Sequence, residues 1–351
     1  MIKQFLCFLI LLCSLSASEQ LDINNPKWFW MDAQIEKDFR IFKGSGITKE
    51  MLDKTMEKVP EISFGDDLVR LQIVNRKVVG REGYAKELLK KICEIYPVPD
   101  VDVIIHEQDI IWNHWLLPSP VLSTCKVKGS TEKMIHFPVQ IWKEWENNFT
   151  KNVERVSENS LWESKTAKIF WRGSPNDADD HYNNREEWGK LRRGKLCCLS
   201  KQYPDLIDAT FSSVHSWLVR EDRREEFFQF FPQKQVSWEE YIQHKYLIEM
   251  DGCVAGTPGF AWKLLSNSAV FKHDSNFTVW FHRAVVPWVH YIPLENDLSD
   301  IFHVLNWAKS HDARVKQIAE NGRVFAKENL MPEHLYLYCY KVLLKYASLQ
   351  K

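Results

Sequence analysis

The sequence predicts an α/β protein, and three observations carry this prediction. Residues 245–274 hold an apolar run, three closely spaced glycines, a helical segment and a second apolar run, in that order. This order of strand, glycine loop, helix and strand builds sheets that are covered by helices. Two further apolar runs, 101–105 and 167–171, each lead into polar residues, as strands do at a sheet edge. The third observation is the length of 351 residues, which is enough for two domains with separate cores.

The composition is that of a globular protein. Hydrophobic residues make up 45% and charged residues 26%, which excludes a disordered or fibrous chain. The formal net charge of −1 gives no electrostatic basis for nucleic acid as the main partner. The 15 tryptophans are unusual, and their rings can stack on sugars or fill a core. We expect most of them to be core residues.

The N-terminus has the pattern of a secretory signal. Lys3 precedes an apolar run over 5–15, and the small residues 16–18 follow. We therefore expect residues 1–17 to be a signal peptide cleaved near Ala17, although retention as an anchor is an alternative. The run is shorter than the roughly 20 apolar residues that span a bilayer. The expectation is a mature chain without a transmembrane helix, in the secretory lumen or the periplasm, and the C-terminus 348–351 has no KDEL-like retention signal.

The cysteines are compatible with an oxidising compartment. Removal of the signal would leave six of the eight, an even number that permits disulfides without fixing their pairing. Their spacing contains no CxxC zinc pattern. Asn148 and Asn276 each begin an Asn-Phe-Thr sequon, which has meaning only in a eukaryotic secretory pathway.

The first third of the chain predicts three elements and one candidate site. Residues 68–79 alternate like a strand or hairpin, and 83–96 have helical spacing. The β-branched run 101–105 predicts a strand that leads into His106 and Asp109. Strand ends carry working side chains in α/β folds, so both residues are candidates, and the alternative is that Asp109 caps a turn.

A polar stretch over 147–165 is typical of a domain boundary. We therefore expect an N-terminal domain over 18–160, a C-terminal domain over 161–335 and a final helix over 336–351. The predicted strand 167–171 ends in Arg172, Gly173 and Ser174, where the crevice of an open sheet would lie.

Charged residues follow this strand closely. Arg185, Arg192 and Arg193 suit phosphate, because a guanidinium donates two parallel hydrogen bonds, but a solvated basic helix face has the same pattern. Asp177 and Asp179 form a D-x-D pattern that either holds a divalent cation or belongs to a turn. We favour the turn.

In the central unit, a buried strand over 246–250 is followed by a loop with Gly252, Gly256 and Gly259. A helix over 260–265 and a strand over 269–271 come next. The loop either presents N–H groups to an anion or is only a tight turn. Further on, we expect an extended segment over 287–293, a helix with Asp297 as N-cap and Asp300 as its capping-box partner, and helices over 313–330 and 333–348.

Four segments in this order resemble glycosyltransferase family 90, which includes Rumi-like protein O-glucosyltransferases and capsule or lipopolysaccharide sugar transferases. They are Phe-Trp-Arg-Gly-Ser at 170–174, Lys-Tyr-Leu-Ile-Glu-Met-Asp-Gly at 245–252, the run 266–275, and the run from Pro-Trp-Val-His-Tyr at 287–300. The resemblance covers residues 165–349 well and the first third loosely.

The resemblance implies a GT-B-like fold, in which two facing Rossmann-like domains enclose a nucleotide-sugar cleft. It implies an inverting enzyme that uses a UDP-sugar as co-substrate and needs neither metal nor other cofactor. It further implies an acceptor that is a protein hydroxyl or a surface glycan and that lies on the N-terminal side. Asp109 matches the family's catalytic base, and Arg172, Gly173, Ser174 and Arg193 match its donor-binding residues. We expect the glycine loop and the start of its helix to bind the donor as well, through Gly252, Gly256, Gly259, Phe260 and Lys263, together with Asp274.

One departure from the family has a functional consequence. Many relatives carry an arginine in the glycine loop for the diphosphate, and the position that looks equivalent is Gly259. We expect Lys263 to substitute as a point charge, and Asp274 to bind ribose hydroxyls. Two alternatives stay open: a member that binds sugar or nucleotide without turnover, and a metal-dependent transferase that uses Asp177 and Asp179.

Overall fold

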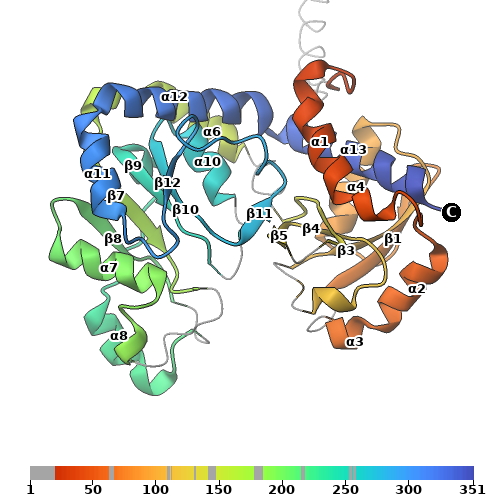
Figure 1. Cartoon of the computed structure of the whole chain (residues 1–351), viewed down its shortest axis with the longest axis horizontal. Helices are drawn as coiled ribbons and strands as arrows, with labels where there is room; N and C mark the ends of the chain where they lie inside the picture. Colours follow the sequence, from red (N-terminus) through yellow and green to blue (C-terminus); the bar gives the residue numbers. More distant parts are fainter. Residues whose placement is uncertain are drawn as a thin grey trace, which may run out of the picture.

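A computed structural model of the chain describes residues 20–62, 67–108, 111, 113–129, 132–140, 148–177, 185–214, 218–252, 255 and 258–351. They form two α/β lobes side by side, each built on one five-stranded sheet (Figure 1). The predicted α/β class and its GT-B-like arrangement of two facing domains are confirmed. The predicted signal peptide lies outside the described residues.

The N-terminal sheet is mixed and has the strand order β2-β1-β3-β4-β6. Its strands are β1 (Leu68–Val74), β2 (Lys77–Val79), β3 (Val101–His106), β4 (Val121–Ser123) and β6 (Met134–His136). β1 runs antiparallel to β2 and β3, whereas β3, β4 and β6 are parallel. The carboxyl ends of these three strands therefore share one edge of the sheet.

The predicted helix over 83–96 is α4, which spans Tyr84–Ile95. Its apolar side chains Leu88, Leu89 and Ile92 are fully buried, as expected for a stripe at helical spacing. The other helices of this lobe are α1 (Phe29–Asp38), α2 (Lys49–Glu57) and α3 (Val59–Ile62). Among the described residues, short 3-10 turns span Pro26–Trp28, Arg40–Phe42, His114–Leu116, Trp162–Ser164, Arg185–Glu187 and Glu221–Arg223.

The C-terminal sheet is parallel throughout and has the order β12-β10-β9-β7-β8. Its strands are β7 (Thr166–Gly173), β8 (Ile207–Phe211), β9 (His244–Glu249), β10 (Ala269–His273) and β12 (Ile292–Leu294). Helices cover both faces, which explains why β9 and β10 are apolar runs rather than alternating ones. The chain order reverses between β7 and β9, the kind of position where open α/β sheets bind ligands.

The central unit folds as predicted, with β9, α10 (Gly259–Leu265) and β10 in succession. The long helix α12 (Asp312–Asn329) packs on α10 through Gly322, where an added Cβ would lie 2.6 Å from the carbonyl oxygen of His290. The remaining helices of this lobe are α6 (Phe149–Glu158), α7 (Arg192–Gln202), α8 (Arg224–Phe230), α9 (Trp238–Ile242) and α11 (Ile301–Ser310).

The predicted start of α11 was wrong. The helix begins at Ile301 with Asp300 as N-cap residue, not after Asp297. The Asp297 carboxylate accepts the N–H of Ser299 at 2.9 Å, and that of Asp300 accepts the N–H of Glu295 at 3.0 Å. Both aspartates therefore stabilise the turn before the helix, because short acidic side chains bond to nearby backbone groups.

The last helix and a pair of short strands connect the lobes (Figure 1). The last helix, α13 (Pro332–Leu349), returns to the N-terminal lobe and packs on α1, α4 and β3. Between the lobes, β5 (Cys125–Val127) pairs antiparallel with β11 (Phe277–Val279).

The described part of the chain has neither a disulfide nor a candidate membrane helix. Four of its five cysteines are free thiols: Cys93, Cys197, Cys198 and Cys339. No helix within it combines the length and apolar content that a membrane crossing requires.

Candidate functional site

A cavity of about 540 Å³ lies at the carboxyl ends of β9, β10 and β12, and we call it the strand-end cavity. Its wall has an aromatic side, with Phe260, Phe281, Trp288 and Tyr291, and a polar side. The charged lining residues of the described chain are five carboxylates against two ammonium groups: Glu249, Asp251, Asp274, Glu295, Asp300, Lys128 and Lys272.

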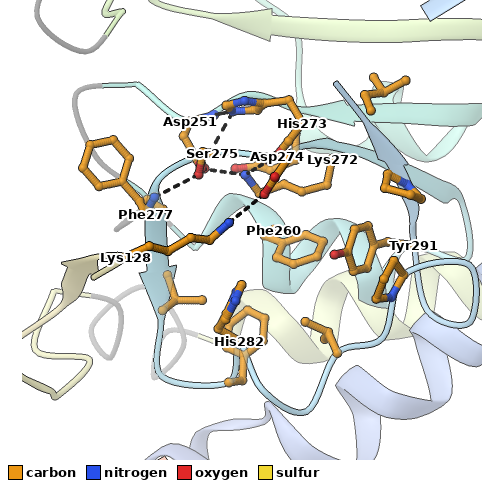
Figure 2. Close-up of a pocket in the computed structure, with 18 of the residues that line it drawn as sticks. Lys128, Asp251, Phe260, Lys272, His273, Asp274, Ser275, Phe277, His282 and Tyr291 are labelled. Atoms are coloured by element: carbon orange, nitrogen blue, oxygen red, sulfur yellow. Dashed lines mark hydrogen bonds and ion pairs between the residues drawn. The ribbon is translucent and has the colours of Figure 1, made fainter. Parts of the chain in front are cut away.

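The polar side is organised by Asp251, which is buried directly after β9 (Figure 2). Its Oδ2 accepts hydrogen bonds from Nζ of Lys272, at 2.6 Å, and from the hydroxyl of Ser275. Its backbone N–H donates to Nε2 of His273 at 2.9 Å. The ring proton of His273 is therefore on Nδ1, which lies 3.0 Å from Oδ1 of Asn296.

The charge states of this cluster follow from its surroundings. Burial alone would favour the neutral acid, but the Lys272 ammonium outweighs it and lowers the pKa of Asp251 to about 2. Burial, followed by the charge of Lys272, lowers the pKa of His273 to about 3. At neutral pH the cavity thus holds an ionised Asp251 and a neutral His273, an arrangement that binds polar groups without exchanging protons.

The aromatic side offers flat apolar faces. The ring centroids of Phe260 and Tyr291 lie 5.5 Å apart in an edge-to-face arrangement, and those of Phe260 and Phe281 lie 5.8 Å apart. Phe260 extends from the first turn of α10, and Figure 2 shows it opposite the Asp251 cluster, across the cavity. Such a wall can stack on a base or on the apolar face of a sugar ring.

The N-terminal lobe contributes Lys128 to the described wall of the strand-end cavity. The β5–β11 pairing carries it there, and its backbone N–H donates to the carbonyl oxygen of Asn276 at 2.7 Å. Its Nζ lies 2.6 Å from Oδ1 of Asp274 (Figure 2). Both side chains are exposed, 39% for Lys128 and 74% for Asp274, and the hydrogen bond from Lys128 lowers the pKa of Asp274.

The predicted residues at the end of β7 have structural partners. The Arg172 guanidinium is buried, donates to Oδ1 of Asp208 at 2.7 Å and also donates to the backbone oxygen of Asp208. It braces β7 against β8 and does not line the strand-end cavity. At Gly173, an added Cβ would lie 2.5 Å from the Trp171 ring, so this position requires glycine for packing.

Arg193, at the start of α7, joins two strand ends. Its two terminal nitrogens donate to the backbone oxygens of Ser174, at 2.8 Å, and Met250, at 2.7 Å. Gly252 packs on the same guanidinium, since an added Cβ would lie 3.0 Å from its Nη2. The structure therefore brings Ser174, Arg193 and Gly252 together between β7 and β9, where the chain order reverses.

Lys263, the point charge that we predicted for the diphosphate, is paired within the protein. Its Nζ lies 2.5 Å from Oε2 of Glu249, and the two side chains are only 8% and 6% exposed. At Gly259, an added Cβ would lie 2.9 Å from the Glu249 carboxylate. Because a buried carboxylate left unpaired is costly, we expect the Lys263 ammonium to stay paired with Glu249. Lys263 is also absent from the cavity wall.

Several predicted residues lie outside the described residues: Asp109, Gly256 and Asp179. Asp177 is described, and its carboxylate accepts the backbone N–H of Arg193 at 3.2 Å. His106 is buried at the end of β3, and burial lowers its pKa to about 4. Within the described ranges, no group of three or more His, Cys, Asp or Glu side chains is placed to hold a metal ion.

Sequence reasoning missed three residues of this wall: Asp251, Lys272 and Lys128. The position of Asp251 directly after a buried strand was a usable signal, since strand ends carry ligand-binding side chains. No local signal marks Lys128, because its place depends on strand pairing across 150 residues.

Comparison with known proteins places the chain in a family. The family model described as "Glycosyl transferase family 90" matches residues 24–351. The human "Protein O-glucosyltransferase 3" is 28% identical over 339 residues, which are 91% of this chain and 62% of that protein. The Aedes aegypti "O-glucosyltransferase rumi homolog" is 25% identical over 90% of this chain and 77% of that protein. This chain thus spans about three fifths of the length of the human relative.

Among solved structures, Anabaena Alr3699/HepE in complex with UDP and glucose matches 66% of this chain and 64% of its own. The TM-score is 0.38 at 10% sequence identity.

Proposed function

The chain belongs to glycosyltransferase family 90, as its motifs predict, and from this premise we propose that it transfers a sugar from a UDP-sugar to a hydroxyl group of an acceptor protein. The observation that carries the proposal is the strand-end cavity, which combines an aromatic wall with ionised carboxylates at the carboxyl edge of a parallel sheet. The names of the relatives support glucose as the sugar and a protein as the acceptor.

The cavity wall matches the neutral parts of such a donor. Carboxylates such as Asp251 accept hydrogen bonds from ribose or sugar hydroxyls, and Phe260 and Tyr291 offer faces for stacking. With five carboxylates against two ammonium groups, the described wall is unfavourable for a diphosphate, except near Lys128. Lys272 is held by the buried Asp251, whereas Lys128 has an exposed partner and can exchange it for a phosphate.

In the proposed reaction, the acceptor oxygen attacks the anomeric carbon from the face opposite UDP. The bond between that carbon and the UDP oxygen breaks, and the acceptor proton passes to the carboxylate of Asp109 as general base. A single displacement inverts the anomeric centre, and no metal is required. Arg193 holds the ends of β7 and β9 in place, and Lys128 replaces Lys263 as the cation proposed to stabilise the leaving diphosphate.

The second candidate is a member that binds a nucleotide-sugar without turning it over. The commitment of Lys263 to Glu249 favours it, because the cation expected to replace the missing loop arginine is not available. The two candidates differ in turnover and share UDP binding.

The test is UDP release from a panel of UDP-sugars, in EDTA, by the unaltered protein and by Asp109→Asn. The proposal expects slow hydrolysis of one donor, and loss of that hydrolysis in Asp109→Asn while UDP still binds. UDP binding without turnover of any donor, with or without manganese and a protein acceptor, would favour the second candidate. Loss of UDP binding in the unaltered protein would contradict both.

A further inference from the structure

A second cavity, of about 440 Å³, lies where the two lobes meet, and we call it the seam cavity. All but three of its lining residues belong to the N-terminal lobe; the C-terminal lobe adds Thr278, His282 and Arg283. It shares Lys128 and His282 with the strand-end cavity, so a group bound in one lies next to the other.

The floor of the seam cavity is a buried network. Asp38 accepts from Nζ of Lys126 at 2.8 Å, and its Oδ2 lies 2.7 Å from Nδ1 of His136. Nε2 of His136 lies 3.1 Å from the hydroxyl of Thr278 in the other lobe. Burial opposes ionisation of Asp38, but His136 and Lys126 outweigh it and hold its pKa well below the usual range. The negative charge of Asp38 is therefore balanced within the floor.

The rim, in contrast, carries surplus positive charge. Arg40 pairs with Glu132 at 2.6 Å, and both side chains are more than half exposed. Lys37 and Arg283 are also exposed, and neither has an ion-pair partner among the residues that the structure describes. The rim thus holds two cations that no carboxylate in the described chain neutralises, although the whole chain carries a net charge of −1.

His282, on the border of the two cavities, lies close enough to Lys128 and Lys37 for their charges to act on it. Partial burial, followed by the positive charge of Lys128, lowers the pKa of His282 to about 4, and Lys37 adds to the effect. Lys128 and Lys37 therefore both contribute positive potential at this border, although burial makes the larger contribution to the shift.

We propose that the seam cavity is an acceptor site and binds carboxylate side chains of the acceptor protein, beside the donor in the strand-end cavity. The inference rests on the proposed function. An acceptor fits better than the donor diphosphate for two reasons. The lining comes mainly from the lobe with the mixed sheet, and the rim cations are exposed to a large incoming partner.

The probe for this proposal is a fluorescein-labelled peptide with one serine flanked by four glutamates, and its neutral counterpart has glutamines at the same positions. Binding is measured by fluorescence anisotropy at about 0.15 M salt, where exposed charges act over roughly 8 Å. The variants are Arg283→Glu and Lys37→Glu. Lys309→Glu, an exposed lysine on α11 outside both cavities, is the matched control. UDP affinity is measured on each protein by calorimetry.

The proposal expects the glutamate peptide to bind at least tenfold more tightly than the glutamine peptide to the unaltered protein. Arg283→Glu should lower its affinity about tenfold and Lys37→Glu severalfold, since each reverses a charge at the rim. Lys309→Glu should have no effect, and UDP affinity should stay within about twofold. All three changes are at exposed positions, and unchanged thermal unfolding would show that they fold normally.

Four results would overturn the proposal. The two peptides could bind equally, or Lys309→Glu could weaken binding as much as Arg283→Glu, which would reduce the effect to general surface charge. UDP affinity could fall with peptide affinity, which would assign the seam cavity to the donor diphosphate. A heparin fragment could bind where the glutamate peptide does not, which would make the ligand a glycan. If instead UDP does not bind the unaltered protein, the proposed function fails, whatever the peptides do.

Discussion

The two cavities that meet at Lys128 and His282 differ in origin, lining and charge. The strand-end cavity belongs to the C-terminal lobe and is aromatic and rich in carboxylates, whereas the seam cavity is built mainly by the N-terminal lobe and is rimmed by cations. Neutral hydroxyl groups suit the first and carboxylates suit the second. Under the proposed function, this difference would sort donor and acceptor by charge before any reaction brings them together.

The largest expected effect is structural and concerns the strand-end cavity. Asp251→Ala leaves the Lys272 ammonium without its buried partner, and removal of one member of a buried pair costs about 3–5 kcal/mol. Asp274→Ala is the matched control, because an exposed pair contributes about 1 kcal/mol or less. Urea unfolding measures both. Equal small losses would mean that Asp251 does not organise the cavity.

A related prediction concerns pH. The pKa of Asp251 is lowered to about 2, so its contribution to stability is present above the unfolded pKa and is lost as pH falls through 2. Given an unfolded pKa of about 3.9, this contribution is roughly 2.5 kcal/mol. The difference in unfolding free energy between the unaltered protein and Asp251→Asn should therefore shrink between about pH 4 and pH 2. A difference that stays constant over this range would contradict the assignment.

An effect of intermediate size tests whether the two cavities bind different ligands. Phe260→Ala removes part of the aromatic wall and should weaken UDP binding about tenfold, because stacking on one ring contributes on the order of 1–2 kcal/mol. The affinity for the glutamate peptide should not change. Phe228→Ala, at an exposed position outside both cavities, is the control for calorimetry on both ligands. A matching loss in the control variant would assign the effect to general destabilisation.

The smallest expected effect is a change in UDP affinity, and it concerns Asp274 and Lys128 at the border of the two cavities. Asp274→Asn releases Lys128 from its ion pair and should raise UDP affinity about twofold to threefold at low salt, with no change at 1 M salt, where the screening length is roughly 3 Å. Calorimetry at the two salt concentrations measures this. A loss of affinity at both concentrations would show instead that Asp274 binds ribose, as we first expected.

The sequence predicted the C-terminal lobe better than the N-terminal one, and the reason is local signal. β9, α10 and β10 follow from apolar runs, glycines and helical spacing that lie within 30 residues. The parallel order of the sheet then places Gly252 and Arg193 at one edge. The seam cavity depends on α1, β5 and β11 meeting in space, and no short pattern encodes that meeting.

The role of Lys263 shows the same limit within a well-predicted element. Helical spacing placed it one turn into α10, but its ammonium group forms an ion pair with Glu249, which lies on the neighbouring strand β9. Similarly, the two aspartates before α11 matched a capping box. Aspartate forms hydrogen bonds to the backbone both in turns and at helix N-termini, so residue type alone could not tell which of the two occurs here. Burial and pairing of charges across elements were the missing information.

The most direct test of the division between the two cavities is saturation-transfer NMR with UDP-glucose on the unaltered protein, Phe260→Ala and Arg283→Glu. We predict strong transfer to the uracil, ribose or glucose protons, a large loss in Phe260→Ala and no change in Arg283→Glu. Loss of transfer in Arg283→Glu, with the signal intact in Phe260→Ala, would contradict the account, because it would place the donor in the seam cavity.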